Sequence, residues 1–226
     1  MHRFSRRILC YRRPTQTRAR PYDVFINHRG IDTKRSVAGL LYDNLTRLKL
    51  HPFMDIKNMN PGDKLFEKID GAIRTCKVGV AVLSPHYCES YFCLHELTSL
   101  LELEKKVIPI FVDIKPSELQ IIDNGSYGVK ELQRFRWALE EAKYTVGLTF
   151  DSCNGDWPDL ITRASNIVTE SLIEVDKECR ERADGNLFSL APLPLLGFNG
   201  KNSALSGLQK WGKVVSGQIL QTLPDI

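Results

Sequence analysis

The residues with the clearest chemical potential lie in the stretch Ser84–Leu97, which reads SPHYCESYFCLHEL. This stretch joins an apolar run that predicts a strand to a segment with leucines at helical spacing. Glu96 falls early in that expected helix, near the carboxyl end of the strand, where α/β proteins bind ligands. On spacing alone, a solvated first-turn acid favoured by the helix dipole is the simpler interpretation.

The same stretch brings four potential metal ligands close together in the sequence: His86, Cys88, Cys93 and His95. Histidine and cysteine are the usual ligands of zinc, so a zinc site is one interpretation. Cys93 and His95 are only two positions apart on the expected helix, however, and therefore point away from each other. We expect no metal site and interpret these residues as ordinary core and surface positions.

Three classes of α/β protein are excluded because their sequence motifs are missing. A phosphoacceptor receiver domain needs an Asp at the end of its third strand, and this chain has Leu83 and Ser84 there. A nucleoside triphosphatase needs a glycine-rich loop that ends in Gly-Lys-Ser or Gly-Lys-Thr, and the chain has none. A dinucleotide-binding loop needs three spaced glycines after the first strand, and only Gly30 is present. Hydride transfer is therefore not expected.

Short strands and amphipathic helices alternate along the central part of the chain. We expect strands over residues 22–26, 51–55, 78–83, 107–111 and 147–150, each followed by apolar residues at helical spacing. Polar turns at 27–30 and 57–62 separate them, and Pro109 indicates an irregular or exposed edge. The pattern predicts an α/β fold, a flavodoxin-like doubly wound five-stranded parallel sheet with helices on both faces.

Both ends of the chain differ in composition from the central part. Residues 1–20 contain seven Arg and no acid, so a chain of formal net charge +4 is left with −3 over the rest. This basic arm fits a disordered tail, an organellar transit peptide or a contact with anionic lipid or nucleic acid. After about residue 180 a Pro- and Gly-rich linker leads to a short amphipathic segment. We therefore divide the chain into an arm over 1–20, a domain over 21–178 and a linker and tail over 179–226.

The composition is that of a globular protein from a reducing compartment. Hydrophobic residues make up 42% of the 226 positions, enough for one substantial core. The apolar runs are too short to span a bilayer. The six cysteines lack paired C-x-x-C spacing and no secretory segment begins the chain, so reduced thiols are expected. The slightly acidic central part argues against a nucleic-acid partner for the folded domain.

Four ordered motifs make residues 22–150 resemble a plant Toll/interleukin-1 receptor (TIR) domain. YDVFINHRGIDT at 22–33 resembles the family's YDVFLSFRGEDT, and the stretch 84–97 resembles SxxYxxSxWCLxEL. IPIFVD at 108–113, with PS at 116–117 and GSYG at 125–128, resembles the later strand and loop. WALEEA at 137–142 resembles the helix motif WxxALxEA with a shift of one residue.

The resemblance implies an enzyme that cleaves NAD+ at the nicotinamide–ribose bond. Glu96 matches the family's catalytic glutamate, and Arg29 and Gly30 should flank the nucleotide. Phe92 stands where the family usually has Trp, near the ribose and nicotinamide, and Ser84 is a weaker candidate contact. No cofactor is implied, because NAD+ is the substrate. The expected products are nicotinamide with ADP-ribose or a cyclic ADP-ribose isomer, which signal in plant immunity and cell death.

Two features differ from the family pattern, and a third segment matches a loop that is mobile in the family. His28 replaces a common Phe, which leaves the packing there open. Gly39 and Leu40 occupy positions that often carry Ser-His in a self-association surface, so that particular interface is not expected. Residues 55–63 correspond to the family's mobile loop between the second strand and the second helix.

The alternative function is a non-enzymatic adaptor that acts only by TIR–TIR self-association, as animal adaptors of this fold do. The intact motif around Glu96 favours the enzyme. Both functions imply further TIR domains as partners, and hence a homo-oligomer. The implied location is the cytoplasm, with the nucleus as a second compartment.

Overall fold

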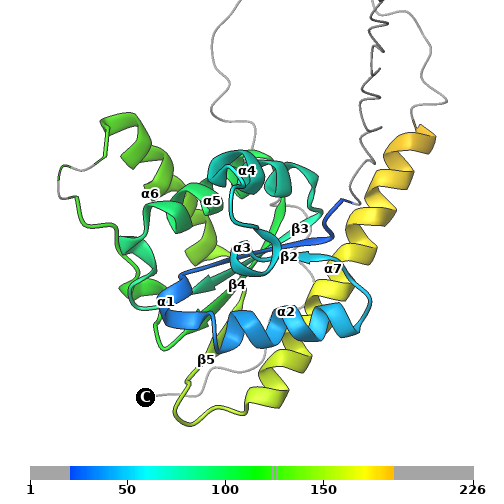
Figure 1. Ribbon diagram of the computed structural model, residues 1–226, viewed down its shortest axis with the longest axis horizontal. Coiled ribbons are helices and arrows are strands. Elements are labelled where there is room, and N and C mark those ends of the chain that lie inside the picture. Colours follow the sequence, from blue (N-terminus) through cyan, green and yellow to red (C-terminus); the bar gives the residue numbers. More distant parts are fainter. Residues whose placement is uncertain (1–20, 124, 126, 186–226) are drawn as a thin grey trace, which may run out of the picture. The chain divides into compact units, whose positions relative to one another are not determined.

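The computed structural model describes residues 21–123, 125 and 127–185 (Figure 1). The basic arm and most of the expected linker and tail lie outside these residues. The described strands are β1 (Val24–His28), β2 (Pro52–Phe53), β3 (Val78–Leu83), β4 (Lys106–Val112) and β5 (Leu148–Phe150). They form a five-stranded parallel sheet in the order β2-β1-β3-β4-β5, which confirms the predicted flavodoxin-like fold.

Helices cover both faces of the sheet because its inner strands are apolar on both sides (Figure 1). One face packs against α4 (Leu65–Thr75), α5 (Tyr91–Glu102) and α6 (Val129–Tyr144). The other packs against α2 (Val37–Arg47) and α7 (Trp157–Gly185), which continues past the expected domain end at 178. Short helical turns complete the chain: α1 (Gly30–Thr33), α3 (Asp55–Asn58), η1 (Tyr87–Glu89) and η2 (Pro116–Glu118). No helix among the described residues is long and apolar enough to cross a membrane.

β1 is longer and β2 shorter than the sequence predicts. Asn27 and His28 were expected in a turn, but they belong to β1, in register with Ala81 and Val82 of β3. β2 was expected over 51–55, yet it pairs with β1 at only two positions, and α3 already begins at Asp55. Pairing with a long central neighbour extends β1, whereas β2 lies at the sheet edge with one partner.

The apolar stripes of two helices are wider than the faces they bury. Leu40 of α2, Leu48 at its C-cap, and Leu65 and Phe66 of α4 belong to the apolar residues at helical spacing, yet all four are exposed. Phe66 instead packs against Phe92 of α5, with ring centroids 5.5 Å apart. Pro109 is buried rather than exposed and pairs in register with Ala81 of β3, but it has no partner in β5, because pairing between β4 and β5 begins only at Ile110.

Candidate active site

The site lies where the carboxyl ends of β1 and β3 meet, the switch point of the strand order. β1 delivers Asn27 and His28 and leads directly into Arg29, which precedes α1. β3 delivers Ser84, and η1 then leads into α5. The hydroxyl of Ser90 accepts a hydrogen bond from the Cys93 backbone N–H and so caps α5. These two connections bring the N-terminal half of α5 over the end of β1.

Glu96 is buried, which makes the interpretation as a solvated first-turn acid wrong. It is the sixth residue of α5, and only 7% of it is exposed. Its Oε2 accepts a hydrogen bond of 2.9 Å from Asn27 Nδ2. Burial raises the pKa of Glu96 to about 8, the hydrogen bond from Asn27 acts in the opposite direction, and the nearby charge of Asp55 adds to the increase. In the free protein this carboxyl group is therefore mostly protonated at neutral pH.

Asn27 and Tyr87 form a buried polar network beneath Glu96. Both side chains are fully buried. The Tyr87 hydroxyl donates to Asn27 Oδ1 and also lies 3.0 Å from the backbone oxygen of Cys93. Asn27 Nδ2 donates to that same oxygen at 3.0 Å, in addition to Glu96. The network ties the end of β1 to the first turns of α5.

A cleft of about 890 Å³ opens beside this network. Three of the predicted site residues, Arg29, Gly30 and Phe92, line it, and Glu96 and Ser84 do not. Phe92 is 40% exposed and precedes Glu96 by four positions, so both lie on the same face of α5. Glu96 thus lies one helical turn behind the cleft wall. The full lining consists of Arg29, Gly30, Ile31, Asp32, Lys34, Arg35, Ser36, Ile56, Ser90, Tyr91 and Phe92.

Asp32 connects two predicted site residues that are far apart in the sequence. Its carboxylate accepts hydrogen bonds from Arg29 Nη1 at 2.9 Å and from the Ser84 hydroxyl at 2.6 Å. Arg29 also pairs with Glu89 of η1 at 3.0 Å. These contacts hold α1 against the ends of β1 and β3. Ser84 is itself buried, and its contact with a nucleotide stays a prediction.

His28 has an unusual environment at the end of β1. Its Nε2 is buried and is the one such side-chain atom without a hydrogen-bond partner among the described residues. The closest ionic group is Asp55 of α3, whose Oδ1 lies 3.9 Å away. Burial lowers the pKa of His28, the dominant effect over the opposing charge of Asp55, so its ring is neutral at pH 7.

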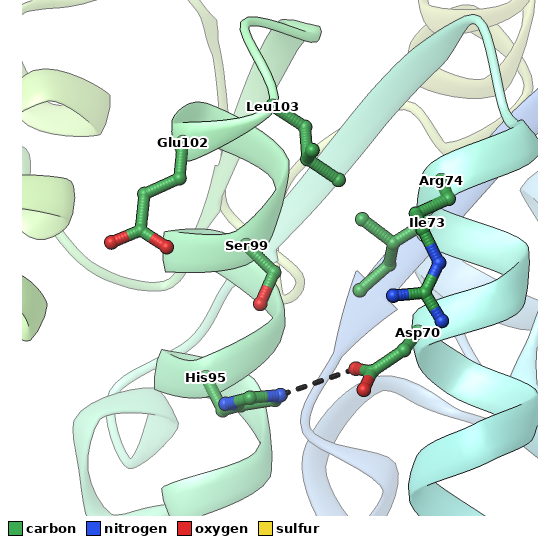
Figure 2. A pocket seen from close by; sticks show the side chains of 7 residues that line it. All are labelled: Asp70, Ile73, Arg74, His95, Ser99, Glu102 and Leu103. Carbon is green, nitrogen blue, oxygen red and sulfur yellow. Dashed lines mark hydrogen bonds and ion pairs between the residues drawn. The ribbon is translucent and has the colours of Figure 1, made fainter.

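The four potential zinc ligands do not converge. Cys93 Sγ faces the backbone oxygen of His28 at 3.4 Å, inside the core. His95 points into a separate hollow of about 190 Å³ between α4 and α5, where its Nε2 lies 3.4 Å from Asp70 (Figure 2). The described part of the chain contains no group of three residues arranged to hold a metal ion.

Gly39 is explained by a close backbone approach. A Cβ atom at this position would lie 2.4 Å from the carbonyl oxygen of Lys34. A serine at 39 therefore requires the turn between α1 and α2 to move. That the Ser-His self-association surface is not used here stays a prediction.

Sequence reasoning assigned no role to Asn27, Asp32 or Tyr87. Asp32 and Tyr87 are part of the motifs RGxDT and SxxY, so their place in the pattern was visible. Their function as connectors depends on which strand ends lie side by side, which the motifs alone do not state. Asn27 stands where the motif of the TIR family has Ser. This difference, two positions before the predicted site residue Arg29, was the one sign in the sequence that could have pointed to Asn27.

Comparison with known proteins gives a consistent result. Residues 21–177, well over half of the chain, match the family described as the TIR domain. A Brachypodium distachyon protein named "Probable 2' cyclic ADP-D-ribose synthase BdTIR" is 50% identical over 159 residues, which cover 69% of this chain and 71% of that protein. The TMV resistance protein N of Nicotiana glutinosa is 27% identical over 79% of this chain, which spans only 17% of that longer protein.

A solved structure shows the same fold. The TIR domains in the structure of the activated Roq1 resistosome, which recognises the pathogen effector XopQ, superpose with a TM-score of 0.56 at 29% sequence identity. The match covers 65% of this chain and 99% of the other chain.

Proposed function

Because the chain belongs to the TIR domain family, we propose that it is an enzyme that cleaves the nicotinamide–ribose bond of NAD+. The products are nicotinamide and ADP-ribose or a cyclic ADP-ribose isomer, and they act as signals in plant immunity and cell death. One observation carries this proposal: a buried glutamate, Glu96, lies one helical turn behind a large cleft and accepts a hydrogen bond from Asn27. The name of the Brachypodium relative supports the cyclic product.

The reaction needs one carboxylate and no general acid. Ordinary glycosidases use a second acid to protonate the leaving oxygen. The nicotinamide of NAD+ is already cationic and leaves as a neutral molecule, so the positive charge that remains develops on the ribose. The Glu96 carboxylate would stabilise that charge, and capture by water or by a hydroxyl group of the same molecule completes the reaction.

The raised pKa of Glu96 suits this role when the substrate is bound. A cationic ring beside the carboxyl group favours its charged form and lowers its pKa below the value of the free protein. The substrate would thus help to produce the catalytic form of the residue. We expect kcat to depend on pH with a lower midpoint than kcat/KM, because kcat reports the substrate complex and kcat/KM the free enzyme.

The cleft offers groups that suit the remainder of the dinucleotide. Lys34 and Arg35 line one wall and have no ion-pair partner within the described ranges, so they are available for the pyrophosphate. Arg29 lies near them but is engaged by Asp32 and Glu89. Phe92 presents an exposed aromatic face to the ribose and nicotinamide, without the indole N–H of the Trp that is usual in the family.

We place this activity in a homo-oligomer in the cytoplasm, with the nucleus as a second compartment. The resistosome in which the structural relative was solved supports assembly through TIR domains. The cysteines at 76, 88, 93, 153 and 179 are free thiols, which suits a reducing compartment.

The test is nicotinamide release from NAD+ by the purified full chain and by two glutamine variants of α5. Glu96→Gln keeps the shape of the side chain but loses its charge, and we expect a hundred- to thousandfold loss of about the size seen when one electrostatic stabiliser is removed. Glu102→Gln makes the same change on the same helix, where Glu102 pairs with Arg134 at 2.7 Å, and should retain activity.

Two results would contradict the proposal. Absence of nicotinamide release from the wild-type chain at high concentration would leave the adaptor function. Retention of more than a tenth of the activity by Glu96→Gln would remove Glu96 from the reaction while leaving an NAD+-cleaving protein.

A further inference from the structure

We infer that Asn27 is a positioning residue for the reaction, which holds the Glu96 carboxylate in the orientation that faces the ribose. The inference rests on the proposed function and extends it to a residue outside the cleft lining. Asn27 touches Glu96 and not the cleft, so it would act entirely through that carboxylate.

The hydrogen bonds of the Asn27 amide leave it a single orientation. Nδ2 carries two hydrogens, and their acceptors are Glu96 Oε2 at 2.9 Å and the Cys93 backbone oxygen at 3.0 Å. Oδ1 accepts from the Tyr87 hydroxyl. A flipped amide would place its oxygen against the Cys93 backbone oxygen, which can only accept, so every polar atom of the amide is satisfied in one orientation only.

Asn27 also makes the one hydrogen bond that the described residues give to the Glu96 side chain. The Oε2 atom is fixed by it, while the other carboxylate oxygen accepts no bond from this part of the chain. One oxygen is thus anchored and the second remains free for a ligand. This is the arrangement that a stabilising carboxylate requires, because its orientation is set before the substrate binds.

The surroundings of Glu96 otherwise oppose its charged form. The neighbouring ionisable groups Tyr87 and Cys93 can become negative but never positive, so neither can attract a charged Glu96. The negative charge of Asp55 in α3 also disfavours it. Asn27 is the neighbour whose contact favours the carboxylate, since a donated hydrogen bond stabilises the charged acceptor. Removing the donor should therefore change how the reaction depends on pH, and a purely structural residue would not do this.

The resembling motif has Ser at this position, and that substitution helps to test the inference. A serine side chain is shorter than asparagine and carries a single hydroxyl donor. We expect it to bond locally to Tyr87 or Cys93 and to leave Glu96 without its anchor. Asn27→Ser and the near-isosteric Asn27→Leu should both remove the hydrogen bond to Glu96, although the two new side chains differ in size and polarity.

The experiment measures the pH profile of kcat/KM for NAD+ cleavage by the full chain. In Asn27→Leu the rising limb should move to higher pH by about one unit, because a hydrogen bond to a charged group is worth about one to two pKa units. Activity at pH 7 should fall at least about tenfold with it. Asn27→Ser should shift the limb in the same direction, and it carries the test if Asn27→Leu does not fold.

Asn44→Leu is the matched control. Asn44 donates its side-chain amide to Ser165 Oγ at 2.8 Å, between α2 and α7 on the opposite face of the sheet. Its loss should lower stability without moving the pH midpoint. Folded, active Asn27 variants with the wild-type midpoint would overturn the inference and leave the proposed function intact. A wild-type chain without nicotinamide release would overturn the proposed function, and the inference with it.

Discussion

A carboxyl group as buried as that of Glu96 destabilises the fold whenever it is charged. Its pKa of about 8 in the folded protein lies well above the value of an exposed glutamate in the unfolded chain. Between those two values the folded state binds one more proton than the unfolded state. The free energy of unfolding therefore falls as pH rises through this window, by up to about 1.4 kcal/mol per pH unit.

Glu96→Gln should remove that dependence, because an amide cannot ionise. We expect the variant to match or exceed the wild type in thermal midpoint at pH 5 and to exceed it by a growing margin up to pH 8. The measurement is the difference in melting temperature between the two proteins across that range. Glu102→Gln serves as the control, since Glu102 is partly exposed and its pairing with Arg134 lowers its pKa. A constant difference between wild type and Glu96→Gln would show that the carboxyl group is not buried as described.

The identity of Glu96 could be predicted from the sequence, but its environment could not. The motif around it is long and ordered, and it marked the residue without any knowledge of burial. Its hydrogen-bond partner Asn27 lies 69 positions away in the chain, and the pairing of β1 with β3 brings the two together. Hydrogen bonds of this kind depend on tertiary contacts that local patterns do not contain.

At the scale of elements, the sequence predicts the inner strands better than the edges. The run at 78–83 is apolar throughout because β3 is covered on both faces, and its bounds are as expected. The predicted first strand ends at residue 26 because Asn27 and His28 are polar, although pairing with β3 keeps both residues in β1. β2 has only two paired residues, and so short a strand leaves a weak pattern.

Near α3, the end of β1 contains a buried polar group that is unusual in the described structure. His28 Nε2 lacks a hydrogen-bond partner there, and its pKa is lowered. Between the lowered pKa and the ordinary value near 6.5, the unfolded chain binds more protons than the folded one, so stability is lost as pH falls through this window.

We therefore expect His28→Phe to stabilise the fold, by about 1–3 kcal/mol for removal of one unsatisfied buried polar atom. Phe is also the residue that the resembling motif has at this position. The gain should increase below pH 6.5, which chemical denaturation at pH 5.5 and 7.5 would measure. Asp55→Asn is the companion variant: it removes the opposing charge and should deepen the loss at low pH. A His28→Phe protein less stable than the wild type would mean that β1 and α3 have no room for the larger ring.

For the whole molecule, the relation between the cleft and Glu96 bears on assembly. Glu96 does not line the cleft, and the segment that begins with α3 contributes Ile56 to the cleft wall and the charge of Asp55 to both Glu96 and His28. We expect a change in that segment to open a path from the cleft to the carboxylate. The family resemblance assigns residues 55–63 to a mobile loop, and a contact with a neighbouring protomer could order it.

We therefore predict that specific activity rises with protein concentration. NAD+ cleavage per protomer, measured over a dilution series with light scattering in parallel, should increase as oligomers form. The Glu96→Gln variant is the control, because it can assemble with wild-type protomers but lacks the carboxylate needed for cleavage. Adding this inactive variant in excess to dilute wild-type protein should raise the activity of each wild-type protomer, whereas an unrelated protein at the same concentration should not. Constant specific activity of a monomeric protein, unaffected by the variant, would mean that one protomer opens its own cleft to Glu96 and that assembly serves another purpose.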